Sequence, residues 1–356
     1  MHATHARAHV AATGRTSGRR TAGGLVTAAA AGLLALGAGL STFYADAVIA
    51  WAPGTAGHPT GDHALGPPSG GGLFFGSTHA ASLGVQGWAV LRLDEPAFDG
   101  AGTDLIVCEN PFFVTGNPET TFSEVLFVEV STDGNTFVRF PAGYGGPAVQ
   151  PVAFQGVRPE WYFGFAGVLP VSADPNRGID PLHVVQGGGD AFDLGDLSEH
   201  PAVLAGDVDL FDIRYVRLVD VRSGVDTDDL GTLVFDAGLD SSASADIDAL
   251  VVVNSLLNQV PQRPAVELEL DSSGFLHLVI EDLNGIDTVV AGLTASANGH
   301  EFDFYTLLPL FLITELTSTK ATLVTGPVPP GVFEVIFKVA AQDAAGHVGG
   351  DAVHIR

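Results

Sequence analysis

Acidic side chains are the residues whose types and spacing are best suited to chemistry in this chain, which contains 41 Asp and Glu residues. Ca²⁺ binds about six to eight oxygens, which loops commonly supply as carboxylates and carbonyls. Acidic residues cluster as Asp99 with Asp104 and Glu109, Asp190 with Asp193, Asp226 with Asp228 and Asp229, and Asp246 with Asp248. These clusters predict a structural calcium ion, and the metal ligands that we expect are Asp104, Glu109, Asp246 and Asp248. None of the clusters has EF-hand spacing, and aspartate beside glycine is also ordinary turn chemistry.

Glu109 lies in the apolar run DLIVCEN, where an ionised carboxylate is costly unless it is paired. If buried, it needs a cation or strong hydrogen bonds, while Asn110 can end the strand before Pro111. Arg217 lies within another apolar run and could neutralise a buried acid. Cys108 is the only cysteine, so no intrachain disulfide can form, and its apolar neighbours indicate an inert buried thiol.

Aromatic side chains indicate where a sugar could bind, because sugar sites combine ring faces with a few polar groups. The ligand-binding candidates are Trp161 and Tyr162 in RPEWYFGF and Tyr144 in the loop AGYGGP. A structural role is the alternative for each of them. Trp88 is expected to belong to the core, because it is flanked by alternating apolar residues.

Catalytic motifs are weak or missing in the sequence. His58, His63 and His79 match no zinc spacing, there is no HExxH motif, and no GxSxG elbow is present. The sequence therefore names no catalytic residue. A pair of carboxylates for glycoside hydrolysis stays open as an alternative, because only their separation in space would identify it.

The first 47 residues have the organisation of a secretory signal peptide. Four arginines precede an apolar run from Ala22 to Leu40, and Ala45-Asp46-Ala47 matches a signal peptidase site. We expect cleavage after Ala47 and a secreted or cell-surface protein. An uncleaved membrane anchor is the alternative, although the Gly- and Ala-rich run is only weakly hydrophobic.

The net charge of −26 excludes one broad class of partner. Phosphate backbones are repelled by such a chain, so nucleic acid is not expected to bind. After signal cleavage no transmembrane anchor is expected either, because the run LLPLFLI (307–313) is too short to span a bilayer and its proline favours an edge or loop position.

Short alternating runs separated by Gly, Pro, Asp and Asn are typical of an all-β protein. The run EVLFVEVS (124–131) meets Asp133-Gly134 and resumes as TFVRF, which predicts a hairpin. The run IRYVRLVDV (213–221) has apolar atoms on both faces, as in a central strand. The run IDALVVVN (247–254) is expected to close the same domain.

A domain boundary is expected in NQVPQRPA (258–265), where two prolines interrupt the pattern and would stiffen a linker. Beyond it, VELEL, FLHLVIED and VFEVIFKVAAQD alternate, and Phe333, Val335, Phe337 and Val339 form one inward row. Several strands within residues 266–356 predict an immunoglobulin-like sandwich.

Eight ordered blocks in residues 48–255 resemble bacterial secreted and cell-surface proteins of unknown function. The blocks are ALGPP, SLG, FDGAGTDLIVCEN, EVLFVEVSTDGNTF, FAG, GGGDAFDLGDL, IRYVRLVDV and ADIDALVVVN. The resemblance implies a jelly-roll, galactose-binding-like domain without an established catalytic activity. By analogy with carbohydrate-binding jelly rolls, Asp248 would be the calcium ligand on the final strand. The last domain resembles bacterial Ig-like modules more loosely.

Together these observations predict an all-β protein with an N-terminal jelly-roll β-sandwich (48–257) and a C-terminal immunoglobulin-like β-sandwich (266–356). The expected function is non-catalytic binding, with an extracellular glycan or another extracellular polymer as the partner. A secreted hydrolase with paired carboxylates and a matrix or surface-layer component are the alternatives.

Overall fold

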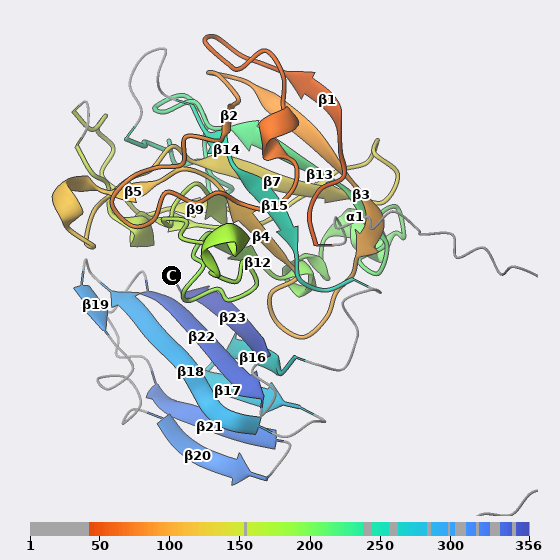
Figure 1. Cartoon of the computed structure of the whole chain (residues 1–356), viewed down its shortest axis with the longest axis vertical. Helices are drawn as coiled ribbons and strands as arrows, with labels where there is room; N and C mark the ends of the chain where they lie inside the picture. Colours follow the sequence, from red (N-terminus) through yellow and green to blue (C-terminus); the bar gives the residue numbers. More distant parts are fainter. Residues whose placement is uncertain are drawn as a thin grey trace, which may run out of the picture. The chain divides into compact units, whose positions relative to one another are not determined.

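Antiparallel strands make up most of the chain. The computed structural model describes residues 43–152, 155–237, 244–255, 263–282, 286–297, 300–302, 311–317, 320–327, 335–343 and 347–355. With 43 % strand and 8 % helix, it confirms the all-β sandwich class (Figure 1). The alternation of apolar and polar residues, with turns rich in Gly and Asp, is the sequence feature behind this class.

The first sandwich consists of a larger and a smaller antiparallel sheet. The larger sheet has the order β1 (Ala47–Ala52), β3 (Trp88–Ala97), β13 (Ile213–Asp220), β7 (Leu126–Ser131) and β11 (Phe165–Ala166), and β8 (Val138–Arg139) pairs with β7. The smaller sheet has the order β12 (Asp190–Phe192), β4 (Leu105–Cys108) and β15 (Ala249–Val252). Their facing side chains form one buried core, which includes Leu91, Leu93, Leu105, Val107, Val128, Val130, Leu218 and Leu250.

Short elements connect these sheets. The two-residue strands pair as β2 (Ala81–Ser82) with β14 (Asp246–Ile247), β5 (Phe112–Phe113) with β6 (Thr121–Phe122), and β9 (Gly143–Tyr144) with β10 (Tyr162–Phe163). The helices are α1 (Pro201–Leu204) and the 3₁₀ turns η1 (Asp62–Ala64), η2 (Val114–Gly116), η3 (Pro159–Trp161), η4 (Pro175–Arg177) and η5 (Leu194–Leu197). Within the described part of the chain, no helix has the length and apolar character needed to cross a membrane.

The second sandwich packs two four-stranded sheets, drawn from teal to blue in Figure 1. One has the order β16 (Ala265–Leu270), β17 (Phe275–Glu281), β21 (Lys320–Pro327) and β20 (Phe311–Leu316). The other has the order β19 (His300–Phe302), β18 (Ile286–Ala297), β22 (Val335–Asp343) and β23 (Val348–Ile355). Its separate core includes Leu268, Leu276, Leu278, Ile280, Leu323, Phe337 and Val339.

Several strand predictions are confirmed. Strand β13 is central, because it pairs with β3 on one side and β7 on the other. The hairpin between β7 and β8 turns at Asp133, whose Oδ1 accepts from the N–H groups of Asn135 and Thr136. Of the expected inward row, Phe337 and Val339 are buried, while Phe333 and the side chain of Val335 lie outside the described residues.

The edge position expected for LLPLFLI is confirmed for residues 311–313, which belong to the edge strand β20. Most of the expected linker, residues 258–262, lies outside the described residues. Arg263 within it donates to the Val348 carbonyl (3.1 Å).

The N-terminal edge of the first sandwich lies upstream of the expected cleavage site. Val252 N–H donates to the Phe43 carbonyl (2.7 Å), Ala45 N–H donates to the Leu250 carbonyl (3.2 Å), and Asp46 N–H donates to the Arg92 carbonyl (2.9 Å). Ala45 is also buried in the main core. A boundary after Ala47 would therefore remove residues that belong to the folded domain.

Candidate binding pocket and metal-ligating clusters

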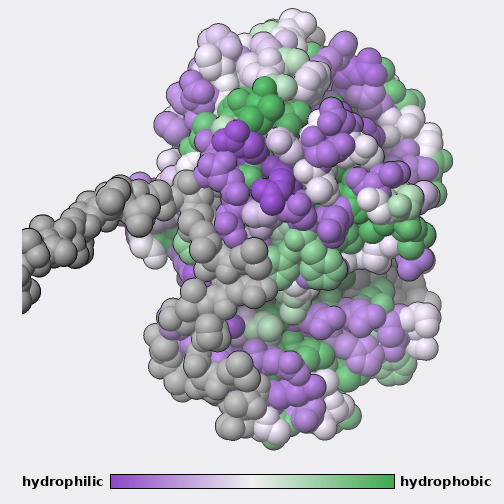
Figure 2. Space-filling view, turned by 90° about the vertical axis from the view of Figure 1, so that its right-hand side faces the viewer, coloured by the Kyte–Doolittle hydropathy of each residue, from purple (hydrophilic) through white to green (hydrophobic). Residues whose placement is uncertain are grey.

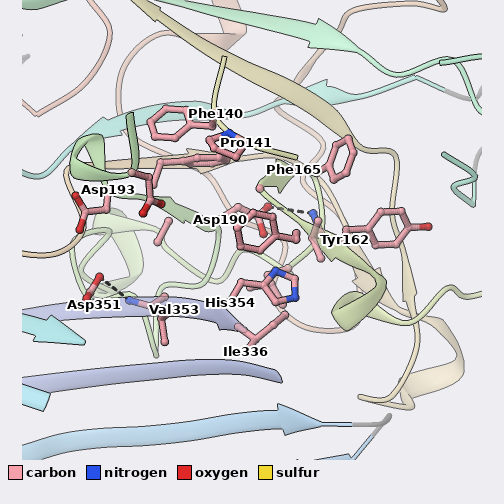
Figure 3. A pocket seen from close by; sticks show the side chains of 18 of the residues that line it. Phe140, Pro141, Tyr162, Phe165, Asp190, Asp193, Ile336, Asp351, Val353 and His354 are labelled. Atoms are coloured by element: carbon pink, nitrogen blue, oxygen red, sulfur yellow. Dashed lines mark hydrogen bonds between the residues drawn. The ribbon is translucent and has the colours of Figure 1, made fainter. Parts of the chain in front are cut away.

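A pocket of about 250 Å³ lies where residues of both sandwiches meet (Figure 3). The first sandwich contributes Phe140, Pro141, Phe163, Asp190, Asp193 and Asp196, and the second contributes Leu268, Ile336, Asp351, Val353 and His354. Asp351 on β23 joins the two sandwiches directly. Thr103 Oγ1 donates to its Oδ1 (2.8 Å), and Leu268 N–H donates to its Oδ2 (2.8 Å).

Only some of the side chains that line the pocket are exposed enough to contact a ligand. Phe140 is 2 % exposed and belongs to the core, whereas Phe163 and His354 are half-buried and Pro141 is exposed. The rings of Phe163 and His354 contact each other at a centroid distance of 5.5 Å. The accessible wall therefore combines an aromatic ring, an imidazole and a proline.

Carboxylates form the polar side of this pocket. Asp193 is half-buried and Asp196 is exposed, so both can accept hydrogen bonds from a ligand. Burial and the nearby Asp104 raise the pKa of Asp193 to about 8. Burial also raises the pKa of Asp190 to about 7, although Asp190 Oδ2 accepts from Gly167 N–H (2.8 Å) and Val168 N–H (3.0 Å). Asp190 thus holds the neighbouring loop and has a structural role.

One group of carboxylates lies beside the pocket with spacing that suits a metal ion. Oxygens of Asp99, Asp104 and Asp193 all lie within 4.8 Å of one another, and this is the one such group found among the described residues. Asp104 is fully buried, and its oxygens already accept from Leu194 N–H (2.7 Å) and Asn254 Nδ2 (2.7 Å). Three carboxylates supply part of the oxygen shell that Ca²⁺ needs. The calcium ligand predicted at Asp104 stays a prediction.

The four metal ligands expected from the sequence do not lie together. Asp104 and Glu109 flank the two ends of β4, and five residues of extended chain span roughly 16 Å. Glu109 instead lies beside Asp246, whose N–H donates to Glu109 Oε1 (2.6 Å). Asp248 is a third, separate position, where its Oδ2 accepts from Ser69 N–H (2.9 Å). The four residues therefore do not share one site, and each stays a separate candidate ligand.

Two of the predicted stacking residues are core residues. Tyr144 and Tyr162 are 2 % and 1 % exposed, and their hydroxyls donate to the carbonyls of Pro147 (3.2 Å) and Phe235 (2.6 Å). A buried ring has no free face for a sugar, so the assignment of Tyr144 is corrected. Tyr162 is buried too, but it contributes to the lining of the pocket (Figure 3), and its assignment stays a prediction. Trp161 is half-buried and packs against the same core. Its assignment stays a prediction.

Other expectations about single residues are settled by burial and pairing. Cys108 is fully buried, and burial raises the pKa of its thiol, as expected for an inert cysteine. Glu109 is 1 % exposed, as its apolar run implied. Arg217 forms an ion pair with the buried Glu129 of β7. Trp88 was expected in the core but is 37 % exposed, because the apolar alternation after it continues on the opposite face of β3.

The remaining acidic and histidine groups are mainly structural. Asp228 is buried, and its Oδ1 accepts from Leu230 N–H and Thr232 N–H, which is turn chemistry. Its Oδ2 accepts from Tyr144 N–H of β9. The rings of His63 and His79 are stacked at 4.4 Å, and His58 lies 5.1 Å from His63. Among the described residues, no histidine belongs to a group whose ligand atoms converge on one point.

Sequence reasoning missed several residues of the pocket and of the buried clusters. Phe163 lies in RPEWYFGF, next to the two aromatic residues that were chosen there, whereas His354 and Glu124 have ordinary sequence surroundings. Only the fold brings Phe163 to His354. Compared with known proteins, the chain matches no protein-family model and no curated protein. The resemblance to bacterial surface proteins accordingly stays a prediction.

Proposed function

We propose that this chain is an extracellular binding protein and that its ligand is a carbohydrate segment of a glycan or another polyhydroxylated polymer. The observation that carries the proposal is the pocket, where the half-buried Phe163 ring lies with His354, Asp193 and Asp196. Sugars present C–H faces to aromatic rings and hydroxyls to carboxylates and imidazoles. The signal-peptide pattern of the first 47 residues supports an extracellular location.

A glycan array tests this proposal, with residues 40–356 as the probe because both sandwiches line the pocket. Calorimetry on the retained glycan then measures the effect of two variants. Phe163→Ala should weaken binding by about two- to tenfold, since an aromatic stacking contact is worth about 0.5–1.5 kcal/mol. Asp193→Ala should weaken it as well, because it removes the carboxyl group that exchanges hydrogen bonds with sugar hydroxyls.

Phe75→Ala is the matched control, because this ring is 76 % exposed and lies outside the pocket. It should leave glycan affinity unchanged. The proposal fails if no glycan is retained, or if Phe163→Ala binds as tightly as the unchanged protein.

A hydrolase is the second candidate, and one observation favours it. The pKa of about 8 at Asp193 keeps a proton on this carboxyl near neutral pH, as a general acid requires. Against it, both oxygens of Asp351 already accept structural hydrogen bonds. Release of reducing ends from the retained glycan, lost in Asp193→Asn, would favour hydrolysis over simple binding.

A further inference from the structure

Three loops of the first sandwich contain no charged residue. They comprise residues 65–78, 110–118 and 140–157, although charged residues make up 16 % of the chain. The second loop includes β5 and the third includes β9, and both strands lie at the left of the first sandwich in Figure 1. The net charge of −26 is therefore carried by the rest of the chain.

Backbone hydrogen bonds join these loops. Phe113 N–H donates to the Leu73 carbonyl (2.8 Å), which connects the first loop to the second. Thr121, three residues after the second loop, donates its N–H to the Val157 carbonyl of the third (2.8 Å) and accepts from Val157 N–H in return. The described residues of the three loops therefore form one continuous surface, which we call the neutral face.

The neutral face presents large apolar side chains to solvent. Five of them are exposed, namely Leu73, Phe74, Phe75, Val149 and Val152. Phe75 is the most exposed of the five, at 76 %. A single exposed apolar side chain is ordinary, but a group of them on one surface marks a site of interaction. None of the five lines the pocket, so this surface is a separate feature.

The far end of the same sandwich has different surroundings. Strand β7 starts near the neutral face and ends near Asp209, whose N–H donates to Thr132 Oγ1 (2.8 Å). Phe211 at that end is 69 % exposed, but it lies between Asp209 and Asp212. Figure 2 views the right-hand side of Figure 1, where hydrophilic residues are spread widely over the first sandwich. Exposed apolar side chains without charged neighbours are thus a property of the neutral face.

The charge of the chain decides what this face can bind. A second copy of the chain would also carry a net charge of −26, and like charges of this size oppose self-association. Anionic lipids and other anionic polymers are repelled in the same way. The surface of a bilayer with zwitterionic headgroups has no net charge, and it takes up the apolar side chains of peripheral proteins. Such a bilayer matches both the missing charges and the exposed apolar side chains.

We propose that the neutral face binds the surface of a lipid bilayer with zwitterionic headgroups, and that Leu73, Phe74 and Phe75 enter its interfacial region. Glycines at positions 70–72 and 76 flank these three residues, so no neighbouring side chain of the loop stands between them and the lipid. Binding strength at a bilayer surface increases with the apolar area that is buried there. This contact is independent of the pocket and of its ligand.

Co-sedimentation of residues 40–356 with phosphatidylcholine vesicles tests the proposal. Phe75→Ala should weaken vesicle binding by about tenfold, because it removes most of the apolar area of one exposed ring. Val152→Ser, in a different loop of the neutral face, should weaken it as well. Phe211→Ala is the matched control, since it removes an equally exposed ring from the acidic end, and it should bind vesicles normally. Phe163→Ala, in the pocket, should also leave vesicle binding unchanged.

Lipid composition and fluorescence separate insertion from other kinds of contact. Phosphatidylglycerol added to the vesicles should weaken binding at low salt, because the acidic chain is repelled, and high salt should restore it. Brominated phosphatidylcholine should quench the added fluorescence of Phe75→Trp but not that of Phe211→Trp. The proposal is overturned if phosphatidylcholine vesicles are not bound, if Phe75→Ala and Phe211→Ala lose binding equally, or if the protein is a dimer that Phe75→Ala dissociates, which would make the neutral face a contact between two copies.

Discussion

Replacing Glu129 by glutamine is expected to destabilise the first sandwich by about 2 kcal/mol. Glu129 is 5 % exposed on β7 and lies opposite Arg139 of β8 and Arg217 of β13. Arg139 Nη2 lies 2.8 Å from Glu129 Oε1, and Arg217 pairs with Oε2. Glutamine would leave two guanidinium groups facing each other without their shared anion.

The magnitude follows from the burial of the three partners. Breaking a fully buried ion pair costs about 3–5 kcal/mol, whereas an exposed pair contributes about 0–1 kcal/mol. The carboxylate is buried, but the side chains of Arg139 and Arg217 are 39 % and 34 % exposed, so water still solvates part of each guanidinium. Both guanidinium groups also lie over phenylalanine rings, at 4.0 and 4.2 Å from the ring centroids. An intermediate value of about 2 kcal/mol is therefore expected.

Urea unfolding followed by tryptophan fluorescence measures this change in the correct domain. The three tryptophans, Trp51, Trp88 and Trp161, all lie in the first sandwich. Their fluorescence therefore reports the unfolding of the first sandwich and not of the second. With a slope of about 2 kcal/mol per molar urea, the midpoint should fall by about 1 M. Asp212→Asn breaks the exposed pair with Arg214 and should cost under about 1 kcal/mol.

A double-mutant cycle isolates the interaction between the charges. Glu129→Gln combined with Arg217→Met should cost less than the sum of the two single changes, since the double variant removes one of the two facing cations. The reasoning is refuted if Glu129→Gln shifts the midpoint no more than Asp212→Asn, or if the two single changes are additive.

Three further predictions concern pH, the N-terminal edge and a glycine. Because burial raises the folded-state pKa of Asp190 from 3.8 to about 7, the free energy of unfolding should fall as the pH rises from about 4 to 7. The melting temperature in EDTA should therefore be higher at pH 5 than at pH 8, and Asp190→Asn should reduce this difference. A chain that begins at Val48 should be about 2–4 kcal/mol less stable than one that begins at Ser41, because it lacks the hydrogen bonds of residues 43–46. Urea unfolding measures the difference, and equal stability of the two chains would contradict this prediction. Gly164→Ala should lower the free energy of unfolding by at least about 2 kcal/mol, because φ is +67° and a Cβ would lie 1.8 Å from a backbone oxygen. Gly178→Ala is the control in the same assay: φ is +75° but the space around it is open, so the loss should be about 1 kcal/mol.

Strands were predictable from the sequence because their signals are local. Alternation around Val128 and Val216 has a period of two residues, and Asp133-Gly134 has the chemistry of a tight turn. Those features depend on neighbours within a few positions. The burial of Glu109 was predictable for the same reason, since an apolar run surrounds it.

The candidate sites were only partly predictable, because their members come from distant segments. Glu109 lies beside Asp246 only when β4 and β14 have taken their places, and no pattern around Glu109 records this. Phe163 and His354 are 191 positions apart in sequence, yet their rings are in contact. Tyr144 was misassigned because composition cannot distinguish an exposed ring from one in a core.

The contact of Asp351 with Thr103 has a consequence for the order in which this protein is completed. Strand β23 supplies one wall of the pocket, while the opposite wall comes from residues 140–196, which are synthesised much earlier. At about 5–20 residues per second, the ribosome adds the later wall on the order of 10 s after the earlier one. During that interval the carboxylates of the first wall face water, and a nascent chain cannot yet hold a ligand between the two walls. Ligand binding would thus report that the second sandwich has been made, folded and docked.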